Sequence, residues 1–85
     1  MKDMVTLVNL SKVNNIVSAE YYCENNETDK GYIEYDIEKK KVIKCSYCQE
    51  DAKSHIKYGA SKAAKAIEIL VAANRFPEKY RYIWY

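Results

Sequence analysis

The sequence has few of the residues on which catalytic sites are commonly built: it contains two glycines, one proline and one histidine. Two glycines exclude a glycine-rich loop that cradles phosphate groups. The single histidine has no second base beside it and no evident acid to orient it, so a nucleophile pair is not indicated. We therefore expect a protein that is not an enzyme and that needs no cofactor.

Long apolar runs and a large net charge are also missing. No apolar stretch approaches the length of a membrane span, and no signal peptide opens the chain. The formal net charge is +2, so bulk charge does not argue for nucleic-acid binding. Three cysteines, an odd number, do not suggest a disulfide framework and favour a reducing cytoplasm. These features predict one small cytoplasmic domain over residues 1–85.

One segment, residues 51–74, has a clear helical period. Advancing by about 100° per residue places apolar side chains along one line of this helix. Asp51 suits the N-cap, Asn74 suits the left-handed turn that ends a helix, and Pro77 prevents continuation. Gly59 weakens the first turns and marks a kink or a close approach to a strand. The core-facing stripe comprises Ile56, Ala60, Ala63, Ile67, Leu70, Val71 and Asn74.

Three runs of alternating polar and apolar residues precede the helix. They cover residues 16–24, 31–37 and 42–47 and are joined by short polar loops, which is typical of an antiparallel meander. Residues 4–10 are rich in β-branched and apolar side chains and predict a further strand, with a helical turn as the alternative. With the helix on one face, the result is a two-layer α+β domain with a three- to four-stranded antiparallel meander.

The alternation also predicts a register. Pairing Cys23 with Ile33, and Ile33 with Tyr47, keeps the apolar side chains on one face, whereas a slip of one residue would expose them. The next two rows are Tyr21–Tyr35–Cys45 and Ala19–Ile37–Ile43. The predicted core comprises Val17, Ala19, Tyr21, Ile33, Tyr35, Ile37, Ile43, Ile67, Leu70 and Val71.

Aromatic residues crowd the segment 76–85. One interpretation is that this segment closes the core and covers the rear of the helix, where Ile69 would otherwise be exposed. The alternative is an interface, either with a partner or between two copies of the chain. The residues of such a homodimer interface would be Ile69, Phe76, Tyr82 and Trp84.

Cys45 and Cys48 form a CxxC pair, and His55 follows. Together with Cys23 they are four potential zinc ligands. The register separates Cys23 and Cys45 by a whole strand, about 9–10 Å, which excludes a disulfide and strains a shared tetrahedral site. We interpret the cysteines as small buried hydrophobic residues with no metal bound, and a small zinc-binding domain is the alternative.

Charge is segregated along the chain. Residues 20–38 carry seven acids and one lysine, whereas residues 39–65 carry eight lysines and two acids. The alternation puts the strand carboxylates and two tyrosines on the sheet face opposite the helix. This predicted acidic face comprises Glu20, Tyr22, Glu24, Tyr32, Glu34 and Asp36.

An acidic face with tyrosines suits a basic protein surface, such as the nucleic-acid groove of an enzyme. The sequence therefore predicts a protein-binding module, such as an inhibitor or accessory protein of phage or mobile-element type, by analogy of size alone. The alternative is a nucleic-acid-binding module that uses lysines. Its basic surface would comprise Lys53, Lys57, Lys62 and Lys65 on the outer side of the helix, together with Lys39, Lys40 and Lys41.

Overall fold

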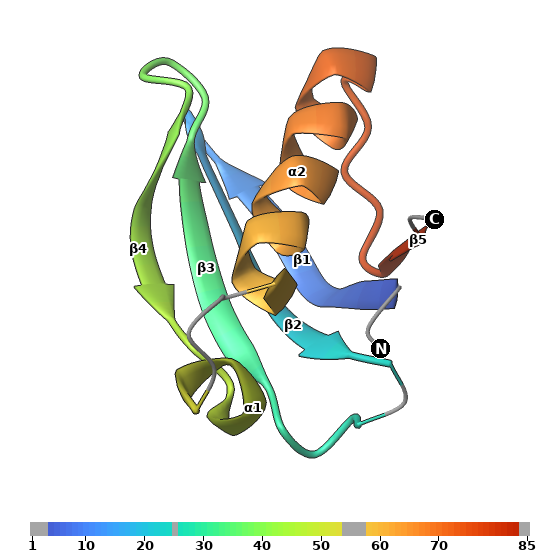
Figure 1. The fold of residues 1–85 in the computed structure, drawn as a ribbon. Helices are drawn as coiled ribbons and strands as arrows, with labels where there is room; N and C mark the ends of the chain where they lie inside the picture. Colours follow the sequence, from blue (N-terminus) through green and yellow to red (C-terminus); the bar gives the residue numbers. More distant parts are fainter. Residues whose placement is uncertain (1–3, 25, 54–57, 84–85) are drawn as a thin grey trace.

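A computed structural model of the chain describes residues 4–24, 26–53 and 58–83. Within these residues, five strands form one antiparallel sheet, and a sixteen-residue helix packs on one face of it (Figure 1). The prediction of a small α+β domain is confirmed, although the sheet has five strands and not three or four. No helix in the described ranges is long and apolar enough to cross a bilayer.

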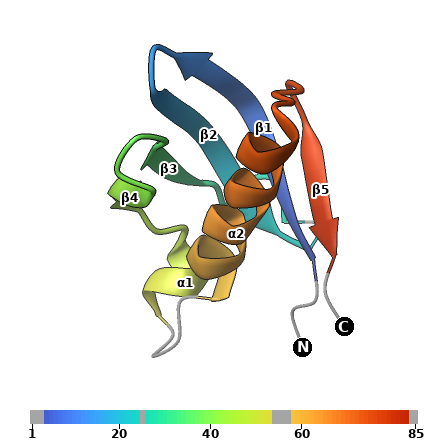
Figure 2. The same cartoon turned by 90° about the horizontal axis from the view of Figure 1, so that it is seen from above.

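The strands follow one another across the sheet, except for the last. The order is β4-β3-β2-β1-β5, so β5 returns to pair with the free side of β1. The helix α2 lies across the inner face of the sheet, and the outer face points the other way (Figure 2). The elements are β1 Met4–Val13, β2 Ile16–Cys23, β3 Gly31–Asp36, β4 Lys41–Ser46, α1 Gln49–Ala52, α2 Tyr58–Ala73 and β5 Tyr80–Ile83.

The first hairpin is longer than the predicted strand at residues 4–10. Asn14 closes it with φ of 56°, a left-handed conformation that asparagine tolerates. A bulge at Asn9, whose φ is 52°, lets β1 continue to Val13. The pairing therefore moves from Val8 with Glu20 to Ser11 with Ser18.

The predicted register is wrong, but by even numbers of residues. Ile33 pairs with Ala19 instead of Cys23, and with Cys45 instead of Tyr47. Because side chains alternate with a period of two, an even shift keeps every apolar residue on the same face. The prediction of the inner face therefore survives the error in register.

β4 departs from strict alternation. Lys44 pairs with Glu34 while Val42 pairs with Tyr35, so Ile43 is an extra residue in a bulge. The bulge leaves Ile43 44% exposed, and its prediction as a core residue is wrong.

The predicted long helix is not found as one element. A short helix α1 ends at Ala52, and α2 begins at Tyr58; Ile56 and the rest of residues 54–57 lie outside the described residues. The C-terminal boundary is as predicted, because Asn74 adopts φ of 54° directly after α2.

The core lies between α2 and the inner face. The alanines of α2 are short, so the helix can lie close to the sheet, and Ile37 and Val71 are only partly buried at the margin. Phe76, Tyr80 and Tyr82 are also partly buried against the core, the last two from β5. The buried apolar residues are Val5, Leu7, Leu10, Val17, Ala19, Tyr21, Cys23, Ile33, Tyr35, Cys48, Ala60, Ala63, Ala66, Ile67 and Leu70.

Two isoleucines on α2 test the orientation of the helix. Ile67 is fully buried, whereas Ile69 is 37% exposed. Ile67→Ala should lower the free energy of unfolding by about 2–4 kcal/mol, because it removes buried methyl groups and leaves a cavity. Ile69→Ala is the matched control and should cost less than about 1 kcal/mol. Equal losses in urea denaturation would show that α2 is rotated relative to this structure.

Candidate functional site

A buried polar cluster lies between β2, α1 and the first turn of α2. The Tyr21 hydroxyl donates a hydrogen bond to Asp51 Oδ2 at 2.8 Å. The backbone amide of Gly59 donates to Oδ1 at 3.1 Å, and that of Ala60 donates to Oδ2 at 2.8 Å. Tyr21 and Asp51 are both fully buried. The carboxylate thus accepts three hydrogen bonds and caps α2 from a separate element.

The short helix α1 positions this carboxylate. Cys48 is its N-cap, with Sγ accepting from the Asp51 amide at 3.5 Å. The Cys48 amide donates to the Tyr21 hydroxyl at 3.3 Å, so that oxygen both accepts and donates. Asp51 does satisfy free amides at the start of a helix, as predicted, but the helix is α2 and Asp51 itself belongs to α1.

Both glycines of the chain lie against the Tyr21 ring. A Cβ atom at Gly31 would lie 2.5 Å from Tyr21 Cζ and 2.7 Å from the Ser46 carbonyl oxygen. A Cβ atom at Gly59 would lie 3.0 Å from Tyr21 Cε2 and 2.6 Å from Cys23 Sγ. The ring is therefore held where a strand and a helix approach too closely for any side chain, which confirms the predicted close approach at Gly59.

Burial sets the protonation of two groups in and near the cluster. Burial raises the pKa of Tyr21 far above its ordinary value, and the hydrogen bond to Asp51 adds to the effect. Burial also raises the pKa of the Cys45 thiol, with smaller contributions from Asp51 and Cys48. Both groups stay protonated at neutral pH, so neither supplies a nucleophilic anion.

Three potential metal ligands meet in the cluster. Sγ of Cys23, Sγ of Cys48 and a carboxylate oxygen of Asp51 all lie within 4.8 Å of one another, and all three residues are buried. Thiolates and carboxylates are ligands for zinc, but a closed structural site needs four of them. Both oxygens of Asp51 already accept from protein donors. The cluster therefore fits a structural cap better than a metal centre.

The structure brings together two of the four predicted zinc candidates. Cys23 and Cys48 are neighbours, Cys45 lies outside their group, and His55 lies outside the described residues. Cys48 reaches Cys23 because α1 turns back to the core after β4, whereas the sequence placed Cys48 a strand away. The hydrogen bond between Tyr21 and Asp51 was not predicted, although a buried Tyr21 was predicted and a buried tyrosine hydroxyl needs a partner.

The predicted acidic face lies on the outer side of the sheet, opposite α2 (Figure 2). The Tyr32 hydroxyl donates to Glu34 Oε2 at 2.5 Å, and this bond raises the pKa of Tyr32. Glu20 Oε1 accepts from Asn9 Nδ2 at 2.6 Å. The register places the carboxylates in three adjacent cross-strand pairs, Glu20–Tyr32, Ser18–Glu34 and Ile16–Asp36.

Two predicted members of this face are placed differently. Tyr22 is only 4% exposed, and its hydroxyl donates to Glu27 at 3.5 Å, so its ring is not offered to a partner. Glu24 follows the end of β2 with φ of 52°, outside the sheet. The carboxylates that remain on the sheet are those of Glu20, Glu34 and Asp36.

β4 adds lysines to the same outer face. Lys44 pairs with Glu34, and Lys41 pairs with Asp36. The Lys44 ammonium also lies 5.9 Å from the centre of the Tyr32 ring. The outer face is therefore acidic over β2 and β3 and basic along β4.

The predicted basic surface is divided between several places. Lys62 and Lys65 lie on α2, Lys53 follows α1, and Lys57 lies outside the described residues. The lysines at 39–41 lie at the opposite end of β4 from α1 (Figure 1). They do not form one continuous surface with Lys53.

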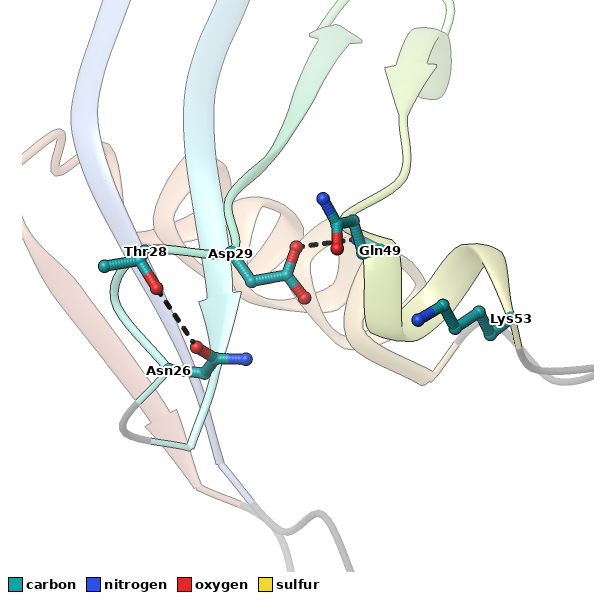
Figure 3. Close-up of a pocket in the computed structure, with 5 residues that line it drawn as sticks. All are labelled: Asn26, Thr28, Asp29, Gln49 and Lys53. Atoms are coloured by element: carbon teal, nitrogen blue, oxygen red, sulfur yellow. Dashed lines mark hydrogen bonds between the residues drawn. The ribbon is translucent and has the colours of Figure 1, made fainter.

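A polar hollow of about 530 Å³ lies between the β2–β3 loop and α1 (Figure 3). Asp29 Oδ1 accepts from the amide of Gln49, the first residue of α1, at 2.7 Å. Thr28 Oγ1 donates to Asn26 Oδ1 at 3.5 Å within the loop. Asp29 thus already holds the loop against α1, and the far wall of the hollow is Lys53.

No protein-family model, curated protein or solved structure matches this chain. Two features of the described residues differ in kind, the buried cluster around Asp51 and the outer face of the sheet. The Tyr21–Asp51 cluster is buried, whereas the carboxylates of the outer sheet face are partly exposed.

Gly59→Ala tests the close approach of α2. On helix propensity alone, alanine should stabilise α2 by up to about 1 kcal/mol relative to glycine. The new Cβ atom would instead lie 2.6 Å from Cys23 Sγ and 2.7 Å from Asp51 Oδ2. The variant should therefore lose about 1–3 kcal/mol of stability in urea denaturation.

Cys23→Ala provides the matched control for this substitution. In the double variant the Sγ contact is gone, so Gly59→Ala should cost less than it does alone. A higher melting temperature for Gly59→Ala alone would mean that the gap between helix and sheet is wider than the structure shows.

The raised pKa of Tyr21 predicts how the free energy of unfolding changes at alkaline pH. The unfolded tyrosine loses its proton near pH 10, while the folded one keeps it, so the stability present below pH 10 falls as pH rises. Each such group contributes a slope of at most about 1.4 kcal/mol per pH unit. Tyr21→Phe should be less stable at neutral pH and should lose stability less steeply above pH 10. Tyr47→Phe, at a 48% exposed position, is the matched control and should lose less stability at neutral pH than Tyr21→Phe.

Proposed function

We propose that this chain is a non-enzymatic protein-binding domain whose outer sheet face binds a basic surface of another protein. The observation that supports this proposal is the set of three carboxylates on β2 and β3. No helix or strand among the described residues covers them (Figure 2). The partner surface would be of the kind found in the nucleic-acid groove of an enzyme, and the chain would act as an inhibitor or accessory protein.

The close spacing of the carboxylates favours a basic partner. Glu34 and Asp36 are two residues apart on one strand, so their side chains share a face. Glu20 lies on the neighbouring strand, one cross-strand pair away from Glu34. Like charges at this spacing repel each other, and a basic partner would relieve the repulsion and be attracted at long range.

Tyr32 adds contact area within this charged surface. Its hydroxyl is fixed by Glu34, so the ring is held in place before any partner arrives. A rigid aromatic side chain loses little conformational freedom on binding, and tyrosine is enriched at binding hot spots. Lys41 and Lys44 border the acidic area on one side, which would orient the partner.

In this proposal the aromatic C-terminal segment closes the core and is not part of the binding surface. Tyr80 and Tyr82 lie on β5, which pairs with β1, and both are partly buried. The homodimer alternative would use Ile69 together with Phe76, Tyr82 and Trp84, and Trp84 lies outside the described residues. The partial burial of Phe76 against the core leaves less of that interface exposed than the sequence suggested.

The nucleic-acid alternative relies on Lys62 and Lys65 of α2, on Lys53 after α1 and on the lysines at 39–41, which lie in separate places, while Lys57 lies outside the described residues. A mobility shift with duplex DNA that persists at about 150 mM salt would favour this alternative over protein binding. The zinc-domain alternative predicts one metal per chain in native mass spectrometry, released by a chelator.

Neutralising the acidic face tests the proposal. The register places Glu34 opposite Lys44 and Asp36 opposite Lys41, so reversal to lysine would put like charges together and destabilise the sheet. Glu20→Gln, Glu34→Gln and Asp36→Asn keep the hydrogen-bond acceptors and should fold normally. The triple variant should associate with the partner about tenfold more slowly at low salt.

The matched control neutralises the helix instead. Proteins recovered on the immobilised parent chain are compared with those recovered on the triple variant and on Lys62→Gln/Lys65→Gln, and association rates are then measured by interferometry. The helix variant should bind as the parent does. If the helix variant loses the partner and the triple variant keeps it, the sheet face is not the binding surface.

A further inference from the structure

β4 is an edge strand with one unpaired side. It pairs with β3, and no other described strand lies beside it. Every residue of β4 except Cys45 is exposed. The backbone amides and carbonyls on its free side are therefore available to an added strand.

An apolar hollow runs along the inner side of this edge. Its volume is about 260 Å³. The helix contributes only small side chains to it, and α2 packs mainly on β1, β2 and β3. Side chains of an added strand that point inward would enter this hollow. The lining residues are Ile33, Val42, Cys45, Tyr47, Ala60, Ser61 and Ala64.

The edge is basic throughout. Residues 39–49 contain four lysines and no acid. Lys41 and Lys44 lie on the outer face, where they would stand beside the outward side chains of an added strand. A strand with carboxylates at these positions would be attracted, whereas β4 of a second copy would bring lysines against lysines.

The bulge at Ile43 restricts pairing further. Bulges and lysines on an edge strand protect it from indiscriminate pairing with other strands. Such repulsive features increase the difference in affinity between a matching partner strand and other strands. The exposed apolar side chains beside the bulge, Val42 and Ile43, remain available for contact.

We propose that β4 accepts an extended segment of a partner protein in which acidic and apolar residues alternate. The segment adds a sixth strand to the sheet by backbone hydrogen bonds to β4. Its apolar side chains enter the hollow beside α2, and its carboxylates face Lys41 and Lys44. This site borders the acidic area over β2 and β3 and takes a partner of the opposite charge.

The test uses end-blocked peptides of about eight residues in which Glu alternates with Val, Leu or Tyr. Binding is followed by amide chemical shifts of the isotope-labelled chain. The expected result is saturable binding with the largest shifts in residues 41–46. Peptides with Lys in place of Glu should bind at least about tenfold more weakly.

Two further comparisons separate strand addition from simple charge attraction. Peptides that are N-methylated at alternate residues lose backbone donors and should bind at least about fivefold more weakly. Ala64→Leu fills the hollow and Lys41→Gln/Lys44→Gln removes the charge, and both should weaken binding. Ala72→Leu and Lys62→Gln/Lys65→Gln are the matched controls on α2 and should bind as the parent does.

Three outcomes would overturn the proposal. The first is the absence of shifts in residues 41–46 with every peptide at about 1 mM. The second is equal binding of the methylated and unmethylated peptides. The third is a dimer in sedimentation that protects the β4 amides without peptide, which would make a second copy the occupant. The two proposals can fail separately, because the acidic face is tested by substitutions at Glu20, Glu34 and Asp36, whereas this test depends on Lys41, Lys44 and the hollow, which those substitutions leave in place.

Discussion

The Asp51 carboxylate and the three donors around it are the contact on which the rest of this fold depends. The donors come from β2 and from the first turn of α2, while the carboxylate itself comes from α1. A buried carboxylate without partners would be very costly, so its burial is tolerated only when all three elements are in place. The cluster therefore makes the sheet, the short helix and the long helix form together, and gives a small domain a cooperative core.

Alternation along the strands was enough to predict which residues face the helix, because a strand has only two sides. It was not enough to predict register, since the partner of Ile33 can shift by an even number of residues, from Cys23 to Ala19 on β2 or from Tyr47 to Cys45 on β4, without a change of face. The bulge at Ile43 could not be predicted from the alternation of polar and apolar residues. An extra residue on one strand reverses which side chains face inward from that point on. Helix propensity continues through residues 51–74, whereas in the structure Asp51 belongs to α1 and accepts from the Gly59 amide of α2.

The surfaces proposed for binding were predictable to a similar degree. The carboxylates of Glu20, Glu34 and Asp36 share a face because of their spacing alone. The charge count assigned the lysines of β4 to a separate basic half of the chain, although the predicted meander already placed residues 42–47 beside residues 31–37; the structure brings Lys41 and Lys44 to the border of the acidic area. Charge counts along a sequence do not show which strands become neighbours. The buried cluster needed contacts between residues thirty positions apart, such as Tyr21 and Asp51.

The return of β5 to β1 has a consequence for synthesis. Val5 of β1 pairs with Tyr82 of β5, so β1 can complete its pairing only after β5 has been synthesised. Chains emerge from the ribosome with the N-terminal end first, and the meander of β1 to β4 can assemble in that order. One side of β1 stays unpaired until Tyr80–Ile83 have emerged, because a contact that closes so long a loop forms late. During this interval a nascent chain is open to pairing with a neighbouring copy on the same messenger RNA.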